Sequence, residues 1–218
     1  NITMYNVIEN YNKKPQDVLI QDPDIIFDAE NHKYFDKKRN KYVARSISDV
    51  VRKTKFVNDN MLKAAERGTV IHEAAQIWCE TKDINLALAK AGKYKNWLEH
   101  LINYEMFNTW NPIANELRMI DRKRDIAGTC DVILENKNGK LVLADFKTMT
   151  KYEKKNHKSQ IGGYLSLLQI NYPTITIDRC RVIYITPEGI RTDDYMPMEC
   201  IEDYEAVRSI YFDLQVPF

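Results

Sequence analysis

Residues 141–148 read Leu-Val-Leu-Ala-Asp-Phe-Lys-Thr, an apolar run that ends in a polar cluster. The run from Leu141 to Ala144 offers apolar side chains to both faces of a strand, which is typical of a strand buried on both sides. Asp145 is therefore expected to emerge at the edge of a core. Because ligand sites of open α/β sheets form at strand ends, these residues predict both a central strand and a candidate site.

The segments on either side predict the rest of a mixed sheet with a crossover helix. Asn136-Lys137-Asn138-Gly139 is a hairpin-turn signal between the strand before it and residues 141–146. A helical pattern farther along the chain stops before Pro173. Strands are expected over residues 113–118, 125–134, 180–186 and 190–195, and helices over residues 154–171 and 201–212. This order predicts an α/β fold with a mixed central sheet flanked by helices.

The first half of the chain predicts short strands followed by helices. The strands are expected over residues 25–27, 33–35 and 42–44, with a hairpin turn between the last two. Ser46 or Ser48 can cap a short helix opening at Asp49, and Asn58 or Asp59 can cap a longer one that runs to about Thr81. A third helix is expected over residues 84–107. The positions expected to face a core are Met61, Ala65, Val70, Ala74 and Ile77 in the longer helix and Leu86, Ala89, Tyr94, Trp97, Leu101 and Tyr104 in the third.

Length and composition limit what the chain can be. A chain of 218 residues is expected to form one domain over residues 1–218. Its 32 Lys and Arg against 31 Asp and Glu exclude a bulk polycation but not a local basic groove. The longest uncharged stretch, residues 159–177, is too polar to span a bilayer, and residues 1–20 lack the apolar core of a signal peptide.

The cysteine pattern points to a reducing compartment. The four cysteines, Cys79, Cys130, Cys180 and Cys200, are scattered and form no Cys-x-x-Cys pair. A secreted disulfide scaffold would be shorter and richer in cysteine, and a zinc site usually has closely spaced ligands. We therefore expect reduced thiols in a cytoplasmic or nucleoid-associated protein, or in the host cytoplasm if the chain is phage-encoded.

Two carboxylates and a lysine form the chemical constellation of the sequence. Asp145 and Lys147 are two residues apart on one strand and so share a face, and the hairpin can bring Asp131 opposite them. Converging carboxylates repel each other unless a cation lies between them, and oxygen ligands suit Mg²⁺. A neighbouring lysine can hold the attacking water. The alternative is a surface ion pair of Asp145 with Lys147.

Four spaced motifs carry a resemblance to a known family. Gly128-x-x-Asp131, Asp145-x-Lys147, Gln160-x-x-x-Tyr164 and the upstream Gly68-x-x-x-His72 resemble the PD-(D/E)xK nuclease superfamily. Within it the chain is most similar to the RecB-like exonuclease branch, which includes CRISPR-associated adaptation nucleases, mitochondrial genome-maintenance exonuclease and phage proteins. The similarity covers about residues 30–190. It implies a restriction-endonuclease-like nuclease core over residues 111–218, strands and a helix over 1–57, and a helical segment over 58–110 that roofs the site.

The resemblance also implies roles for individual residues. Asp131 and Asp145 would bind Mg²⁺ or Mn²⁺ together with the backbone carbonyl of Phe146. Lys147 would position the water nucleophile, so that Asp131, Asp145 and Lys147 form the catalytic set. His72 would be a ligand or a near neighbour of the metal. Glu116 stands where some members of the family place an additional acidic group.

A second group of residues would support the nucleic acid. The family uses the pair corresponding to Gln160 and Tyr164 to steady the motif and the strand; the alternative is a tyrosine packed on the sheet with Gln160 at its rim. Gly68 fits a close helix approach, and Gly162-Gly163 is interpreted as a close approach to a phosphate backbone. Basic residues expected to follow phosphates are Arg118, Arg122, Lys123 and Arg124 at the first hairpin and Lys151, Lys154, Lys155, His157 and Lys158 near the crossover helix. Aromatic residues that could stack on unpaired bases are Tyr94, Trp97, Tyr152 and Tyr164.

The predicted function is a Mg²⁺- or Mn²⁺-dependent DNA exonuclease acting on single-stranded ends in recombination, repair or replication, with a recombination or replication protein as a further partner. Alternatives are an endonuclease or structure-specific nuclease on the same core, and a catalytically idle module that binds DNA or a partner. Some RecB-like members carry a four-cysteine iron–sulfur cluster, with three of the cysteines near the C-terminus. This chain has no such group, so no cluster is expected.

Overall fold

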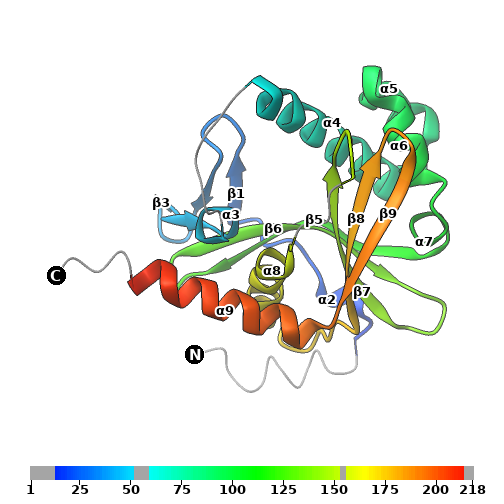
Figure 1. The fold of residues 1–218 in the computed structure, drawn as a ribbon. Coiled ribbons are helices and arrows are strands. Elements are labelled where there is room, and N and C mark those ends of the chain that lie inside the picture. Colours follow the sequence, from blue (N-terminus) through cyan, green and yellow to red (C-terminus); the bar gives the residue numbers. More distant parts are fainter. Residues whose placement is uncertain (1–12, 52–58, 153–155, 214–218) are drawn as a thin grey trace.

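The computed structural model describes residues 13–51, 59–152 and 156–213 (Figure 1). Asn58, Lys154 and Lys155 lie outside these residues, so the cap expected at Asn58 and the phosphate role expected for the two lysines are not addressed. The helices are α2 Pro15–Val18, α3 Ile47–Val51, α4 Asp59–Thr81, α5 Ile84–Ala91, the 3₁₀ helix η1 Gly92–Tyr94, α6 Lys95–Ile102, α7 Glu105–Thr109, α8 Lys158–Asn171 and α9 Pro197–Asp213. The strands are β1 Ile25–Asp28, β2 Lys33–Asp36, β3 Lys41–Tyr42, β4 Arg45–Ser46, β5 Asn111–Asp121, β6 Ile126–Glu135, β7 Leu141–Thr148, β8 Arg179–Thr186 and β9 Gly189–Tyr195.

A mixed six-stranded sheet organises the chain and confirms the predicted fold class. The strand order is β4-β6-β7-β8-β9, with β5 paired to β6. The contacts β5–β6, β6–β7 and β8–β9 are antiparallel, whereas β4–β6 and β7–β8 are parallel. The crossover from β7 to β8 runs through α8, as a parallel pair requires. A separate antiparallel sheet of β1, β2 and β3 lies at one side (Figure 1).

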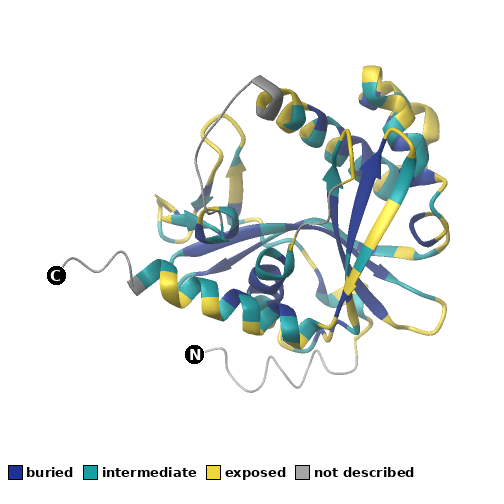
Figure 2. Ribbon diagram, viewed as in Figure 1, coloured by how far each residue is buried: buried dark blue, intermediate teal, exposed yellow. Residues whose placement is uncertain are grey.

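Helices cover both faces of the main sheet. Helices α3, α8 and α9 pack against one face of the sheet and form one core with it. Helices α4, α5, α6 and α7 pack against the other face and form a second core. The central strands are accordingly buried along most of their length (Figure 2). The run from Leu141 to Ala144 is buried at every position, with Leu141 and Leu143 in one core and Ala144 in the other.

Local signals placed several boundaries correctly. Ser46 caps α3: its Oγ accepts the Asp49 N–H at 3.1 Å, and Asp49 Oδ2 accepts the Ser46 N–H at 3.0 Å. The helix begins at Ile47, two residues earlier than expected. The β6–β7 hairpin turns at the predicted residues, with Gly139 at a φ of 73°, a left-handed conformation that glycine adopts without strain.

The single helix expected over residues 84–107 is wrong, because the segment is divided among α5, η1, α6 and α7. Gly92 ends α5 at a φ of 54°, and its N–H caps the carbonyl of Leu88. Of the predicted core positions, Leu86 and Ala89 are exposed, and Ala87 and Ala91 are buried in their place. The other predictions are confirmed: Leu101 lies in the core, and Tyr94, Trp97 and Tyr104 pack against it.

The apolar face expected for α4 is also partly wrong. Ala74 is buried and Ile77 packs against the core, as predicted, whereas Ala65 is exposed. The side chain of Met61 lies outside the described residues. Arg67, Ile71 and Ala75 are also buried, so the buried stripe contains a charged residue.

The paired glycines of α8 serve helix packing, which corrects their interpretation as a phosphate approach. A Cβ at Gly162 would lie 1.9 Å from the carbonyl oxygen of Cys200 in α9, and one at Gly163 would lie 2.7 Å from Ile47 in α3. At Gly162 the backbone of α9 therefore leaves no room for a Cβ, and at Gly163 the side chain of Ile47 fills the space. These glycines let α8 sit between its two neighbouring helices.

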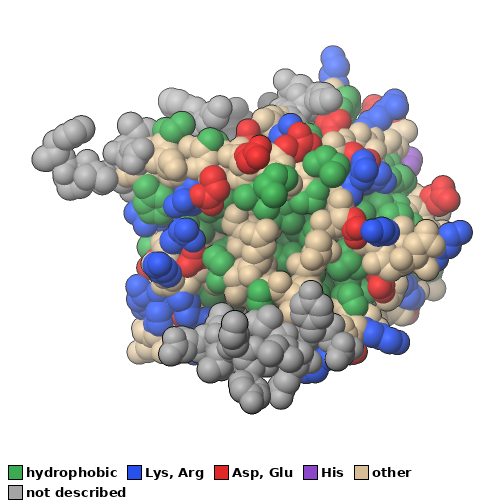
Figure 3. Space-filling model, turned by 90° about the horizontal axis from the view of Figure 1, so that it is seen from below, with side chains coloured by type: hydrophobic (Ala, Val, Ile, Leu, Met, Phe, Trp, Pro, Cys, Tyr) green, Lys and Arg blue, Asp and Glu red, His purple; other side chains and the backbone are tan. Residues whose placement is uncertain are grey.

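The surface carries charges of both signs. On the face in Figure 3, acidic and basic side chains are scattered with hydrophobic side chains between them, as the near-zero net charge suggests. No helix within the described residues is long and apolar enough to cross a membrane.

Candidate metal centre

The site lies where the central sheet divides. β6 and β7 pair from Glu135↔Leu141 to Val132↔Ala144 and no farther. Beyond that point β6 pairs with β4, whereas β7 continues along β8 as far as Thr148. Asp131 and Asp145 are the first residues past the last pair, so the fork between the strands brings both carboxylates together. The Phe146 N–H donates to Asp131 Oδ2 at 2.5 Å and bridges the two strands.

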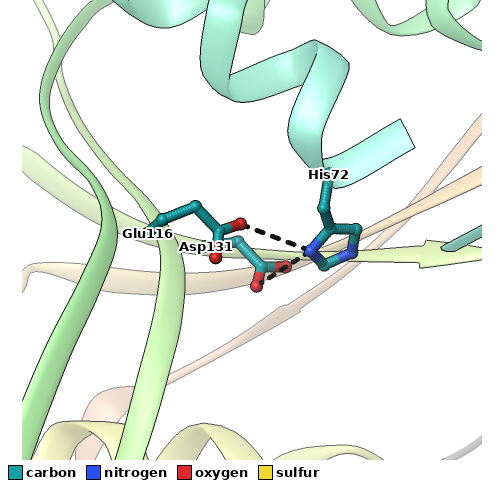
Figure 4. A group of neighbouring side chains, drawn as sticks. All are labelled: His72, Glu116 and Asp131. Carbon is teal, nitrogen blue, oxygen red and sulfur yellow. Dashed lines mark ion pairs between the residues drawn. The ribbon is translucent and has the colours of Figure 1, made fainter. Parts of the chain in front are cut away.

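Three side chains from three elements converge at this fork (Figure 4). His72 descends from α4, Glu116 comes from β5 and Asp131 from β6. His72 Nδ1 lies 3.4 Å from Asp131 Oδ1 and 3.5 Å from Glu116 Oε1. One ligand atom from each residue lies within 4.8 Å of the others, which suits a shared cation.

Two backbone features complete the arrangement around His72. Its Nε2 lies 3.3 Å from the carbonyl oxygen of Phe146, the backbone group expected near a metal. Glu116 has a φ of 45° in the middle of a strand, a left-handed conformation that costs a non-glycine residue free energy. Such strain tends to persist at functional sites, where the surrounding structure enforces it. Here the long β5–β6 pairing holds Glu116 in place on both sides.

Asp145 and Lys147 form the other half of the fork. Lys147 Nζ lies 2.6 Å from Asp145 Oδ2. The Asp145 carboxylate is 1% exposed, and its Oδ1 has no hydrogen-bond donor among the described residues. A buried carboxylate oxygen without a partner is costly, because it has lost its water and gained nothing in return. A surface ion pair does not describe a carboxylate buried this deeply.

The electrostatics indicate an excess of buried negative charge. Burial raises the pKa of Asp131 to about 7; the nearby His72 opposes this rise, and Asp145 and Glu116 add to it. Burial lowers the pKa of His72, but Asp131 and Glu116 outweigh it and raise the value to about 9. Burial likewise lowers the pKa of Lys147, and Asp145 and Asp131 raise it above its ordinary value. A carboxylate whose pKa is raised to near neutral, as that of Asp131 is, marks a candidate functional site.

Gln160 and Tyr164 lie on one face of α8, as predicted, next to the fork. Gln160 Nε2 donates to the Tyr164 hydroxyl at 2.7 Å. Tyr164 is 6% exposed and packs over Gly128, where a Cβ would come within 3.3 Å of its ring. Burial, with Asp145 and Asp131 nearby, raises the pKa of Tyr164 well above its ordinary value. The tyrosine thus packs on the sheet with Gln160 at its rim, and its covered ring offers no stacking face.

Two predicted phosphate contacts lie away from the fork, in the turn between β5 and β6. Arg122 pairs with Asp36 at 2.9 Å and Asp22 at 3.3 Å, and Arg124 pairs with Asp121 at 2.9 Å. The five residues of β6 that lead from this turn to Asp131 span about 17 Å at roughly 3.3 Å per residue.

Two other predicted contacts lie in the loop after β7 and on α4. Lys151 is exposed in the loop after β7. Gly68 faces Thr148, but a Cβ there would make only an ordinary contact at 3.8 Å, so packing does not require the glycine.

The sequence reasoning missed Arg67, the residue directly before Gly68. It is 8% exposed, and its Nη2 donates to the carbonyl of Thr148 at 3.2 Å. A signal was present: Arg67 is four and seven residues before Ile71 and Ala74, so it interrupts an apolar stripe with a charge.

Comparisons with known proteins do not identify the chain. No family model matches it, and no curated protein matches it. The crystal structure of SSO0001 has a TM-score of 0.40 and 17% sequence identity, over 99% of this chain and 89% of that one. A match at this level does not establish a family.

Proposed function

We propose that this chain is a Mg²⁺- or Mn²⁺-dependent DNA nuclease of the PD-(D/E)xK type. The observation that carries the proposal is the group of His72, Glu116 and Asp131 at the fork of the central sheet, with the ion pair of Asp145 and Lys147 beside it. Open α/β sheets place their ligand sites where strands separate. Four of these five side chains, His72, Asp131, Asp145 and Lys147, belong to the motifs that carry the resemblance.

The donor set fits a divalent cation. Asp131 and Glu116 offer oxygens beside Nδ1 of His72, and the neighbouring Asp145 would add another oxygen. The carbonyl of Phe146 lies against the other ring nitrogen of His72, Nε2, and so fixes the orientation of the ring. The buried Oδ1 of Asp145 has no donor within the described chain, and a cation would satisfy it. When bound, Mg²⁺ or Mn²⁺ supplies charge stabilisation at the phosphate and lowers the pKa of water.

The side chains have distinct tasks in this proposal. Lys147, held by Asp145 at 2.6 Å, orients the water and keeps its positive charge beside the attacked phosphate. Tyr164 and Gln160 support the floor of the fork from α8. His72 ties α4 to the site, so movement of that helix would alter the ligand geometry.

Replacing His72 by Ala should weaken metal binding. The imidazole is the one nitrogen donor of the set, and nitrogen donors favour Mn²⁺ over the harder Mg²⁺. We expect Mn²⁺ to support cleavage by the parent at least as well as Mg²⁺, and the variant to need about tenfold more Mn²⁺ for half-maximal activity. Metal titrations of cleavage measure both effects.

His100→Ala is the matched control for this titration. His100 lies in α6, where its Nε2 contacts the carbonyl of Pro187, and it should leave the titration unchanged. Superimposable titrations of His72→Ala and the parent would make His72 a packing residue and remove it from the donor set.

We further propose that the enzyme is an exonuclease that needs a free end and prefers an unpaired strand. The support is the placement of α4 over the fork, with His72 reaching down to the carboxylates. A site covered by a helix admits a single strand more readily than the wider duplex. Recombination, repair or replication, with a protein partner from one of them, remains the expected setting.

Linear single-stranded DNA should therefore shorten progressively, while covalently closed circles of the same sequence resist. End-labelled linear substrates and circles, each incubated with Mg²⁺, Mn²⁺ or EDTA, provide the measurement. Equal cutting of circles and linear strands would favour the endonuclease alternative on the same metal site. Binding without any cleavage would favour the idle DNA-binding module.

A further inference from the structure

Arg67 is a buried cation that the proposed metal site does not use. It is 8% exposed, and no other Lys or Arg among the described residues is as deeply buried. The structure records no ion pair for it with a described carboxylate, and its Nε has no hydrogen-bond partner there. Arg181, which is also partly buried, is by contrast held by Asp194.

The surroundings of Arg67 orient its guanidinium without neutralising it. Cζ lies 4.5 Å from the centre of the Trp97 ring, and Nη2 donates to the carbonyl of Thr148. Stacking and one backbone hydrogen bond fix the plane of the group but leave its charge uncompensated. Burying a charge is costly unless an anion completes the site.

The position of Arg67 links it to the fork. Thr148 directly follows Lys147 on β7, and Arg67 precedes His72 by five residues on α4. Five residues advance a helix by about 7.5 Å along its axis, so Arg67 lies about 1.4 turns of α4 from His72. A strand held at the fork would thus place a neighbouring phosphate near Arg67.

We propose that Arg67 binds a phosphodiester group of the DNA strand adjacent to the one that is cleaved. This inference rests on the proposed nuclease function and deepens it by naming a substrate contact. The planar guanidinium matches the oxygens of a phosphate, and the anion supplies the missing counter-charge. Arg67 is then a substrate-binding residue that sets where the strand lies relative to Lys147.

Three variants separate charge from packing. Arg67→Gln keeps an N–H donor for Thr148 but removes the charge, Arg67→Lys keeps the charge, and Arg181→Gln removes a guanidinium already paired with a carboxylate. Binding of a fluorescent single-stranded oligonucleotide is measured in EDTA over a range of KCl concentrations. KM and kcat are measured with Mn²⁺, and thermal melting checks that each variant is folded.

We expect Arg67→Gln to raise KM at least about tenfold, with a much smaller change in kcat, because a charge-assisted contact outside the reacting group is lost. The slope of log affinity against log salt should fall by about 0.7. Arg67→Lys should keep the parental slope, and Arg181→Gln should match the parent in both slope and KM.

A folded Arg67→Gln with parental KM and salt slope would overturn the inference while leaving the nuclease proposal intact. A parent that neither binds nor cuts DNA would overturn both. If Arg67→Gln does not fold, the inference is tested on the parent protein by NMR. The Arg67 Nε–H resonance should shift when the oligonucleotide is added. An unchanged resonance would overturn the inference.

Discussion

Asp145→Asn should abolish phosphodiester cleavage and leave the protein folded. The substitution keeps the shape of a side chain that is 1% exposed and removes its charge from the centre of the proposed donor set. A metal ion contributes several kcal/mol of charge stabilisation, and losing about 4 kcal/mol lowers the rate about 10³-fold. Lys147→Ala should cost at least about 10²-fold, the scale of one acid–base group.

The same substitution should not weaken DNA binding. It removes negative charge beside a polyanion, so affinity measured in EDTA should stay the same or rise. Asp194→Asn is the matched control: it neutralises a carboxylate of the same sheet that is bound to Arg181 outside the fork, and cleavage should be unchanged. Full cleavage activity of a clean Asp145→Asn preparation would contradict the proposed nuclease function.

Gly162→Ala should destabilise the fold by about 3 kcal/mol, near the upper end of ordinary overpacking effects. The new Cβ would lie 1.9 Å from the Cys200 carbonyl oxygen, and backbone atoms of α9 cannot move aside as a flexible side chain could. This clash can be relieved only if α8 and α9 move apart, and that movement would open the core between them and the sheet. Denaturant unfolding measures the loss.

Gly68→Ala is the matched control because it is the same change within a helix. Its Cβ would make an ordinary 3.8 Å contact with Thr148, and replacing a helix-interior glycine gains up to about 1 kcal/mol. The two variants should therefore shift the unfolding midpoint in opposite directions. A shift of the same sign and size in both would contradict the packing role of Gly162.

Short-range patterns predicted the sheet well because their causes are local. The spacing of hydrophobic residues indicates a strand, and the residues from Asn136 to Gly139 indicate a turn. Neither signal depends on residues far away in the chain. Asp145 and Lys147 share a face through strand geometry alone, and the hairpin then brings Asp131 near them. Central strand, hairpin and carboxylate pair could thus be derived from a few consecutive residues.

The ends of the helices were less predictable, because a single residue can end a helix. Gly92 was not recognised as the end of α5, and Leu86 and Ala89 before it were wrongly placed on the buried face. The core positions predicted after it, Tyr94, Trp97, Leu101 and Tyr104, were correct. Helix propensity shows that Gly162 and Gly163 destabilise α8, but it does not show why they are there. A close approach to a phosphate and close packing between helices would look the same in the sequence, and only the contact with α9 identifies packing.

The sequence by itself determined the fold class, the central strand and the Asp131, Asp145 and Lys147 group, since these follow from periodicity and turn chemistry. Only the tertiary structure decided how the group is completed. The fork forms because β6 leaves β7 to pair with β4. His72 and Glu116 meet Asp131 because two further elements pack there, and Arg67 is left without a counter-charge because α4 lies against β7 and Trp97. Contacts between residues far apart in the chain depend on the packing of whole elements, and a local pattern carries no information about that packing.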